Sequence, residues 1–333
     1  MDVRDPVADL RRIAFLLERA HESTYRVRAF RTAAAALRAE VGRGKDLATL
    51  DLKKVKGVGE VTARCVEESL AGEVPVYLRR LEATEGVEIG QEAADLRAAL
   101  RGDCHSHTDQ SDGGSPLWEM VETAITLGHE YLVITDHSPR LTVANGLSPE
   151  RLRAQLEQIA SLNEGLTGFR VLTGIEVDIL DDGALDQDEE LLSQLDVVVA
   201  SVHSKLRMPH AEMTERMLTA IANPHVDVLG HCTGRMVTGK RSRPESEFDA
   251  KAVFAACAEY GTAVEINSRP ERLDPPKRLL RLAVEAGCEF TIDTDAHAPG
   301  QLDWLDNGCT RAALCGVPAD RVRNTRAAES LLT

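Results

Sequence analysis

Residues 101–114 read Arg-Gly-Asp-Cys-His-Ser-His-Thr-Asp-Gln-Ser-Asp-Gly-Gly. In an extended segment, side chains at positions i and i+2 project to the same side. His105 and His107 would therefore point together, as two ligands of one metal ion must. The Gly-Gly-Ser-Pro sequence that follows indicates a loop that opens a helix at about Pro116. The histidine pair is thus expected at the end of a strand, where α/β folds carry their chemistry.

A single His-x-His pair is a weak signal, and it gains weight here because the pattern recurs. Six more apolar runs follow, and most of them end in a His, Asp or Glu residue; they span residues 131–137, 169–176, 196–203, 226–231, 263–267 and 289–297. Short buried strands that alternate with helical patterns are typical of parallel βα units. Seven such units predict a barrel whose polar groups meet at one mouth. Four histidines end no such run and are interpreted as structural: His21, His129, His210 and His225.

The composition is that of a globular protein outside the membrane. The chain has 333 residues, enough for two domains or for one large and one small domain. It contains no run of 18 apolar residues and no basic-then-apolar leader at its start, so neither a membrane span nor a secretory signal is expected. Its seven cysteines lack framework spacing, which indicates reduced thiols and a cytoplasmic location.

The charge is uneven along the chain. Residues 1–66 contain 14 Lys and Arg against 9 Asp and Glu, whereas residues 101–333 contain 22 against 37. A polyanion would therefore be attracted to the first segment more than to the second. A basic loop at residues 235–244 interrupts the acidic segment. It is interpreted either as a contact for a substrate phosphate or as an ordinary surface loop.

The first 80 residues are expected to be helical and to contact nucleic acid. Apolar residues at helical spacing predict amphipathic helices over 6–21 and 26–40. A helical stretch, two close glycines and a second helix then resemble a helix-hairpin-helix, which offers backbone N–H groups to one phosphate. The candidate DNA-binding residues are Lys53, Lys54, Lys56, Gly57 and Gly59. An ordinary turn between helices with glycine caps is the alternative.

The motifs after residue 100 resemble the polymerase-and-histidinol-phosphatase (PHP) domain, above all the PHP domain that ends bacterial family X DNA polymerases. The matching motifs lie at residues 101–108, 111–113, 134–138, 174–178, 200–203, 230–235, 265–267 and 294–297. Residues 1–80 resemble the helix-hairpin-helix domain of the same polymerases, and residues 81–100 are interpreted as a connector. No counterpart of the polymerase palm is present, so polymerase activity is not expected. The resemblance implies a distorted (βα)7 barrel over residues 101–333, preceded by a small all-α domain.

The resemblance also implies up to three divalent metal ions, namely zinc, manganese or iron. It assigns one ion to His105, His107, Glu176 and Asp295, a second to Glu176, His203 and His231 with Glu176 as the bridge, and a third to Asp112, His137 and His297. Mixed imidazole and carboxylate ligands suit these metals. Near the mouth, Arg235 and Lys205 are candidates to neutralise phosphate charge. Asp136 is a candidate support or proton carrier.

These features favour a metal-dependent phosphoesterase that acts through a metal-activated water. Its phosphoester substrate would bind at the barrel mouth. The basic first segment favours DNA as substrate and partner, with 3'-5' exonuclease or end-processing activity in DNA repair. A phosphatase of a small phosphomonoester, such as histidinol phosphate or a nucleotide, is one alternative. A DNA-binding module without catalysis is another. An amidohydrolase would carry a bridging carbamylated lysine, whereas Glu176 takes that position here.

Overall fold

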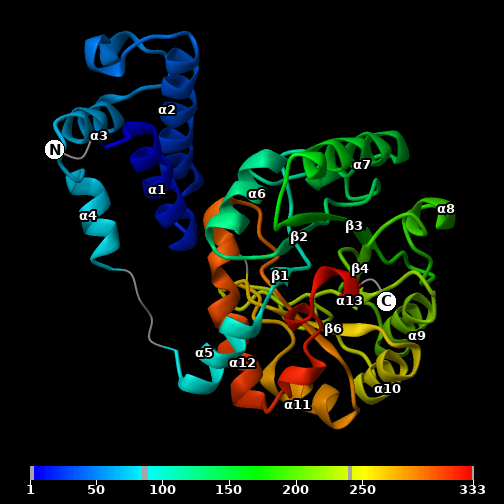
Figure 1. Ribbon diagram of the computed structural model, residues 1–333. Coiled ribbons are helices and arrows are strands. Elements are labelled where there is room, and N and C mark those ends of the chain that lie inside the picture. Colours follow the sequence, from blue (N-terminus) through cyan, green and yellow to red (C-terminus); the bar gives the residue numbers. More distant parts are fainter. Residues whose placement is uncertain (1–3, 85–88, 239–241, 332–333) are drawn as a thin grey trace. The chain divides into compact units, whose positions relative to one another are not determined.

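The computed structural model describes residues 4–84, 89–238 and 242–331 (Figure 1). The chain forms two compact units, Met1–Glu88 and Ile89–Thr333. Parts of the predicted connector and of the basic loop, at residues 85–88 and 239–241, lie outside the described residues. None of the described helices combines the length and the apolar character that a membrane crossing requires.

The first unit is a small helical bundle. Its elements are α1 (Pro6–Arg19), α2 (Thr24–Gly42), the 3-10 turns η1 (Leu47–Thr49) and η2 (Leu52–Lys54), α3 (Glu60–Leu70) and α4 (Val76–Glu82). Helix α1 begins at Pro6 because Asp5 accepts the N–H of Val7 and the fixed φ of proline suits the first turn. The expected apolar stripes of α1 and α2 are buried and face each other, which confirms the two amphipathic helices.

The glycine-containing turn between η2 and α3 is tighter than the sequence indicated. The residues directly before the turn, Leu52–Lys54, form a single 3-10 turn and not an α-helix. Gly57 has a φ of +98°, and a Cβ atom there would lie 2.9 Å from Cγ2 of Thr32 on α2. Both the backbone conformation and the close approach therefore require glycine at this position.

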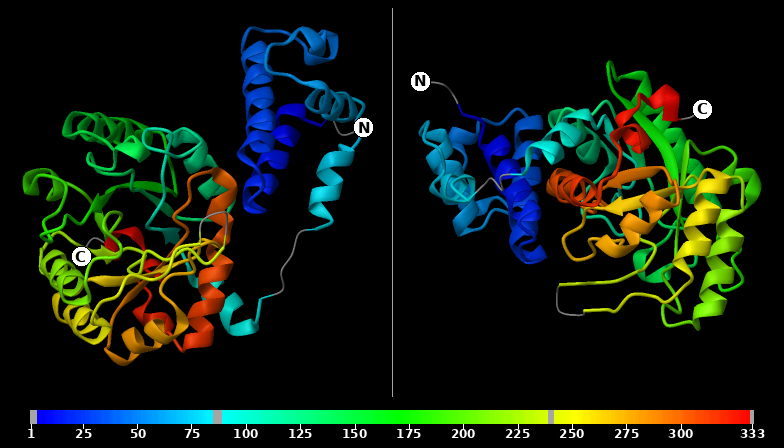
Figure 2. Two further views of the ribbon diagram at one scale, coloured as in Figure 1. Left: turned by 180° about the vertical axis from the view of Figure 1, so that it is seen from behind. Right: turned by 90° about the horizontal axis from the view of Figure 1, so that it is seen from below.

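The second unit is built on a parallel sheet of seven strands in sequence order (Figures 1 and 2). The strands are β1 (Gly102–Asp103), β2 (Tyr131–Ile134), β3 (Arg170–Asp178), β4 (Val197–Ser201), β5 (Val228–Leu229), β6 (Ala263–Asn267) and β7 (Phe290–Asp293). The two ends of the sheet meet beyond the strands, where Ser106 forms a parallel bridge with Ala296. This nearly closed arrangement confirms the predicted (βα)7 barrel.

Alternate residues of the strands fill the two faces of the sheet. One cluster contains buried side chains from strands β2 to β6, among them Val133, Leu172 and Val199. The residues between them, such as Ile175 and Val198, pack in a second cluster with the surrounding helices. Because these parallel strands are buried on both faces, their sequences are nearly continuous apolar runs.

Helices surround this sheet (Figure 2). They are α5 (Gln91–Ala99), α6 (Leu117–Thr126), α7 (Pro149–Glu164), α8 (Glu189–Leu192), α9 (His210–Ile221), α10 (Ala250–Tyr260), α11 (Lys277–Glu285), α12 (Leu305–Cys315) and α13 (Ala328–Leu331), with 3-10 turns at Thr142–Ala144, Pro299–Trp304, Ala319–Arg321 and Arg323–Thr325. Helix α5 packs on α12, with Ala93 and Leu96 buried in the core of this unit. The part of the predicted connector that forms α5 is therefore part of the barrel unit.

Candidate metal centre

The residues expected to bind metal all lie at the carboxyl ends of strands or just beyond them. Parallel strands deliver their carboxyl ends to one side of a barrel, so these side chains converge. The set is His105, His107 and Asp112 after β1, His137 after β2, Glu176 near the end of β3, His203 after β4, His231 after β5, and Asp295 and His297 after β7.

Glu176 is the centre of this set. Its carboxylate is buried, and each oxygen contacts ring nitrogens from different strands. Oε1 lies 2.8 Å from Nε2 of His231 and 3.2 Å from Nε2 of His203. Oε2 lies 2.9 Å from Nδ1 of His137, 3.4 Å from Nε2 of His105 and 3.6 Å from Nε2 of His107. One carboxylate thus touches five histidines, which is the geometry expected of a bridging ligand.

A second focus lies around Asp112. Its Oδ1 is 3.5 Å from Nε2 of His137 and 3.3 Å from Nε2 of His297. Nε2 of His107 lies 3.4 Å from Oδ1 of Asp295. The rings of His107 and His297 are 4.2 Å apart between centroids. The two foci are therefore joined through His107 and His137.

Three groups of ligand atoms lie close enough together to hold one ion each. Within each group the atoms are no more than 4.8 Å apart; the groups are His107, Asp112, His137 and His297, then His105, His107 and Glu176, then His137, Glu176 and His203. Glu176 belongs to two of them. His107 and His137 are each shared between two groups, and His231 and Asp295 join by the contacts given above. The assignment of individual ions stays a prediction.

The donor atoms of this cluster fit divalent metal ions. Several buried atoms have no hydrogen-bond partner within the described structure: Nε2 of His105, both ring nitrogens of His107 and His203, Nδ1 of His137 and His231, and Oε2 of Glu176. Buried polar atoms are almost always paired in proteins. Unpaired imidazole nitrogens and a carboxylate oxygen that point together are ligands suited to zinc, manganese or iron.

Burial and neighbouring charges prepare two of these groups, His107 and Glu176, as ligands. Burial, with help from His297 and His137, lowers the pKa of His107 to about 3, so the ring is neutral. Burial acts to raise the pKa of Glu176, but His203 and His105 outweigh it and hold that pKa well below its ordinary value. Metal ligands need a neutral imidazole and an ionised carboxyl group.

Glu265 and Asp178 support the histidines from behind. Oε1 of Glu265 lies 2.6 Å from Nδ1 of His105, and its Oε2 accepts the backbone N–H of His231 at 2.5 Å. Oδ1 of Asp178 lies 3.4 Å from Nδ1 of His203. Such carboxylates fix the tautomer and orientation of a ligand ring. Glu265 lies within the apolar run 263–267, and Asp178 lies two residues beyond the run that ends at Glu176.

Two arginines in the loop after β6 also reach the cluster. Nε of Arg272 donates to Oδ2 of Asp295 at 3.0 Å. Nη1 of Arg269 donates to the carbonyl oxygen of Asp295 and lies 3.0 Å from Nδ1 of His297. Burial acts to lower the pKa of Arg272, but Asp295 and Glu176 outweigh burial and raise this pKa. These residues end no strand, so the sequence pattern did not single them out.

The three candidate catalytic residues differ in their surroundings. Asp136 is buried and accepts hydrogen bonds from Thr108, Ser111 and Gln155, so it anchors the loop after β1. Arg235 donates to the carbonyl oxygens of residues 272 and 273, and Nζ of Lys205 lies 2.5 Å from Oδ2 of Asp181. Arg269 and Arg272, by contrast, contact Asp295 and His297 directly.

The candidate DNA-binding residues form part of a second surface, on the first unit. Lys53, Lys54 and Lys56 are exposed, and Lys54 pairs with Asp51 at 3.0 Å. A cavity of about 620 Å³ lies beside them, lined by Lys53, Val58, Gly59, Glu60, Ala63, Arg64 and Glu67. The N–H of Gly59 donates to Oγ1 of Thr62 at 2.9 Å, so it is engaged within the hairpin. The exposed lysines are therefore the stronger phosphate candidates.

Comparison with known proteins places these features in context. The model of the PHP domain matches residues 103–269, and that of a helix-hairpin-helix domain matches residues 1–74. The chain is 40% identical over 245 residues to the DNA polymerase/3'-5' exonuclease PolX of Bacillus subtilis (strain 168). That match covers 74% of this chain but 41% of the polymerase, so the chain corresponds to less than half of it.

Other proteins match about two thirds of the chain. A protein of Thermoanaerobacter sp. (strain X514) named a probable phosphatase is 29% identical over 234 residues, which cover 67% of this chain and 89% of that protein. The crystal structure of histidinol phosphate phosphatase from Lactococcus lactis, complexed with zinc, L-histidinol and phosphate, aligns with a TM-score of 0.46 and 20% identity. It covers 65% of this chain and 92% of that chain.

Proposed function

Because the chain belongs to the PHP domain family and is a metal-dependent phosphoesterase, we propose that its substrate is DNA. The proposed reaction is 3'-5' exonuclease or end-processing hydrolysis in DNA repair. The observation that carries this proposal is the union, in one chain, of a histidine and carboxylate cluster with a helix-hairpin-helix unit. A phosphatase of small metabolites has no need of the second unit.

Two further features support DNA over a small substrate. The similarity to the exonuclease-bearing polymerase reaches 40% identity, against 29% for the protein named a probable phosphatase. Residues 1–66 have an excess of five basic residues, 14 against 9, in a chain with a net charge of −15. A basic segment of this kind attracts a polyanion, which the acidic residues 101–333 would repel.

We propose that the nine candidate ligands hold up to three divalent ions in the arrangement that the family resemblance implies. Bound divalent ions lower the pKa of a water ligand and neutralise the oxygens of a phosphoryl group. Glu265 contacts the ring of His105 and Asp178 contacts the ring of His203, so each carboxylate orients its histidine toward a metal ion. Asp136 holds the loop that carries Asp112.

Arg272 and Arg269 take the role of cationic groups toward the substrate phosphate in this proposal. Their guanidinium groups contact Asp295 and His297 at the edge of the cluster, and both side chains are mostly buried. A guanidinium in a partly desolvated site stabilises negative charge on a phosphoryl group more strongly than one in water. Lys205 is exposed and paired with Asp181, which makes it less suited.

A substrate panel tests the proposal. The full chain is incubated with Mn²⁺ and either single-stranded DNA or histidinol phosphate, with and without a chelator. We expect DNA to be shortened, the chelator to stop the reaction, and His203→Ala to remove most activity while the fold persists. Intact DNA beside cleaved histidinol phosphate would reject the DNA substrate.

A phosphatase of a small phosphomonoester is the second candidate. It is favoured by the match of 67% of this chain to 89% of a protein named a probable phosphatase and by the acidity of residues 101–333, which contain 22 basic against 37 acidic residues. The same panel decides between the two candidates. Binding of DNA without hydrolysis, under every metal supplied, would instead support a non-catalytic DNA-binding module.

A further inference from the structure

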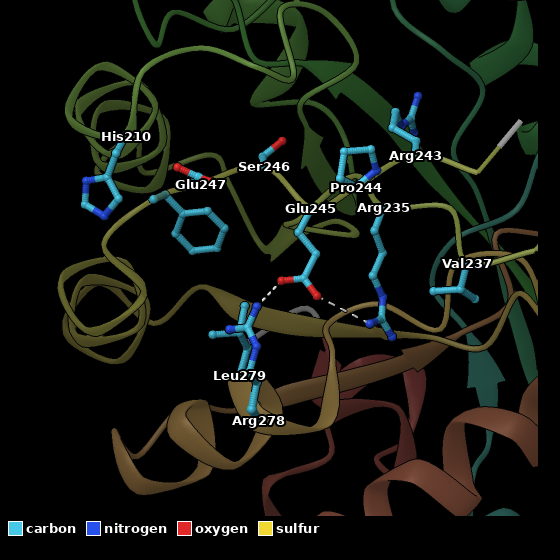
Figure 3. A pocket seen from close by; sticks show the side chains of 11 residues that line it. His210, Arg235, Val237, Arg243, Pro244, Glu245, Ser246, Glu247, Arg278 and Leu279 are labelled. Atoms are coloured by element: carbon cyan, nitrogen blue, oxygen red, sulfur yellow. Dashed lines mark hydrogen bonds and ion pairs between the residues drawn. The ribbon is translucent and has the colours of Figure 1, made fainter.

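A pocket of about 670 Å³ lies on the barrel unit beside the loop that follows β5 (Figure 3). Arg235, Arg243 and Arg278 contribute to its lining together with Glu245 and Phe248. The lining contains three arginines against two glutamates, Glu245 and Glu247, whereas residues 101–333 as a whole contain 22 Lys and Arg against 37 Asp and Glu. This arginine pocket is thus a basic spot on an acidic domain.

A carboxylate occupies the space between two of the arginines. Figure 3 shows Glu245 reaching toward both Arg235 and Arg278. Oε1 of Glu245 lies 3.6 Å from Nη1 of Arg235, and its Oε2 pairs with Nη2 of Arg278. The two guanidinium groups therefore already hold one anionic group between them. A phosphate offers the same negative oxygens to the same donors.

The pocket is connected to the metal centre by two segments. Four positions separate His231 from Arg235, so their Cα atoms lie within about 14 Å of each other. Arg272 joins the two places directly, because its carbonyl oxygen accepts from Nε of Arg235 while its side chain contacts Asp295. A DNA strand carries a phosphate about every 3.4 Å along the axis. The pocket is thus within a few nucleotides of the cluster.

We propose that the arginine pocket binds a phosphodiester group of the DNA strand, a few nucleotides from the scissile bond. Glu245 fills this place in the free protein, and the DNA phosphate displaces its carboxylate from Arg278 and Arg235. The pocket then selects a strand over a single phosphomonoester, because only a strand supplies a second phosphate. This inference rests on the proposed DNA substrate and names the residues that recognise it.

Steady-state kinetics with the full chain and Mn²⁺ test the pocket. The substrates are a fluorescent oligothymidylate and p-nitrophenyl phosphate, and KM for the oligothymidylate is measured at several salt concentrations. Arg278→Ala should raise that KM about threefold, since the arginine is 64% exposed and a surface contact is modest. The slope of log KM against log salt should fall by about 0.7, the value for one phosphate of a single strand that is no longer neutralised.

Two further variants complete the test. Glu245→Gln should lower KM for the oligothymidylate about threefold, because the competing charge is gone. Arg281→Ala is the matched control, since Arg281 lies one turn further along α11, is exposed, and contacts the carbonyl oxygen of Leu314 rather than the pocket. It should behave as the unchanged protein. Circular dichroism and thermal unfolding confirm that each variant is folded.

The outcomes separate the two proposals. If the protein cleaves oligothymidylate but Arg278→Ala and Glu245→Gln leave KM and the salt slope unchanged, the pocket is not a phosphate subsite and the DNA substrate stands. If only p-nitrophenyl phosphate is cleaved, the DNA substrate falls and the pocket inference with it. Inhibition by inorganic phosphate that depends on Arg278, without an effect on the oligothymidylate, would assign the pocket to free phosphate and overturn the inference.

Discussion

Nδ1 of His105 lies 2.6 Å from Oε1 of Glu265, so the other ring nitrogen of His105 faces Glu176. The same carboxylate accepts the backbone N–H of His231 through Oε2. Glu265 therefore orients two candidate ligand residues that follow different strands. Because its side chain is fully buried, solvent does not weaken either contact.

Substitution of Glu265 by Gln should weaken metal binding while the fold persists. The amide keeps the shape of the carboxylate but loses the charge that makes His105 a stronger ligand. Loss of such a supporting group lowers metal affinity by about 10–100-fold. Competition with a chromophoric chelator measures the affinity. Glu259→Gln, at an exposed position near the end of α10, is the control. Equal affinities for the two variants would contradict the supporting role.

Arg272 and Lys205 should differ sharply in their effect on hydrolysis. Arg272→Gln removes a charged donor beside Asp295 and should reduce kcat about 100-fold, as for the loss of a group that stabilises developing charge. Lys205→Gln removes an exposed pair with Asp181 and should change kcat less than about twofold. Metal content is measured for both, so that loss of an ion is not mistaken for loss of the arginine. Similar rates for the two variants would sink the proposed role of Arg272.

His129 should make stability depend on pH. Its side chain is buried, and neither ring nitrogen has a partner within the described structure. Burial, followed by the nearby Arg97, lowers its pKa to about 3 from the ordinary 6.5. As the pH falls, His129 therefore becomes protonated in the unfolded chain at a higher pH than in the folded protein. Stability is unaffected above about pH 6.5 and is lost as the pH falls from there toward about 3.

Between pH 7 and pH 5 this histidine should cost about 2 kcal/mol of stability. Denaturant unfolding at the two pH values measures the loss. His129→Gln should lose about 2 kcal/mol less than the unchanged protein over the same interval. His210→Gln, at an exposed position at the start of α9, serves as the comparison. A pH dependence that survives in His129→Gln would place its origin elsewhere.

The lysines of the hairpin should contribute to DNA binding through phosphate contacts. Replacing Lys53 or Lys56 by Ala should weaken binding to duplex DNA of any sequence and reduce the salt slope by about 0.9 for each phosphate that is no longer neutralised. Lys54 already pairs with Asp51, so its replacement should have a smaller effect. Fluorescence polarisation at several salt concentrations measures the slope. Lys251→Ala, at an exposed position on α10, is the control. If the salt slopes of Lys53→Ala and Lys56→Ala equal that of Lys251→Ala, these two lysines do not contact DNA phosphates.

Much of the barrel was predictable because the sequence of each strand is an apolar run, and most of these runs end in a polar residue. The run at 169–176 ends in Glu176, and the structure places that residue at the focus of five histidines. Apolar spacing also predicted the helices now seen as α1 and α2, and a turn signal predicted the start of α6. A repeated pattern of this kind fixes which side of the sheet receives the polar groups.

Other parts depend on contacts that no local pattern encodes. Arg269 and Arg272 lie in an irregular loop, and their direction is set by distant partners such as Asp295. Lys205 follows the strand that leads to His203. Its backbone has a φ of +48°, and its side chain pairs with Asp181. Helix α5 was interpreted as a connector because its sequence is acidic, and only the packing on α12 reveals its place.

The barrel closes where Ser106 meets Ala296, and this has a consequence for biosynthesis. His105 and His107 leave the ribosome early, whereas Asp295 and His297 emerge only after every intervening strand has been made. A nascent chain that stops before β7 lacks the contacts from His107 to Asp295 and from Asp112 to His297. The candidate metal centre is therefore completed only after β7 has been synthesised, so a chain that stops before β7 lacks two of its nine candidate ligands.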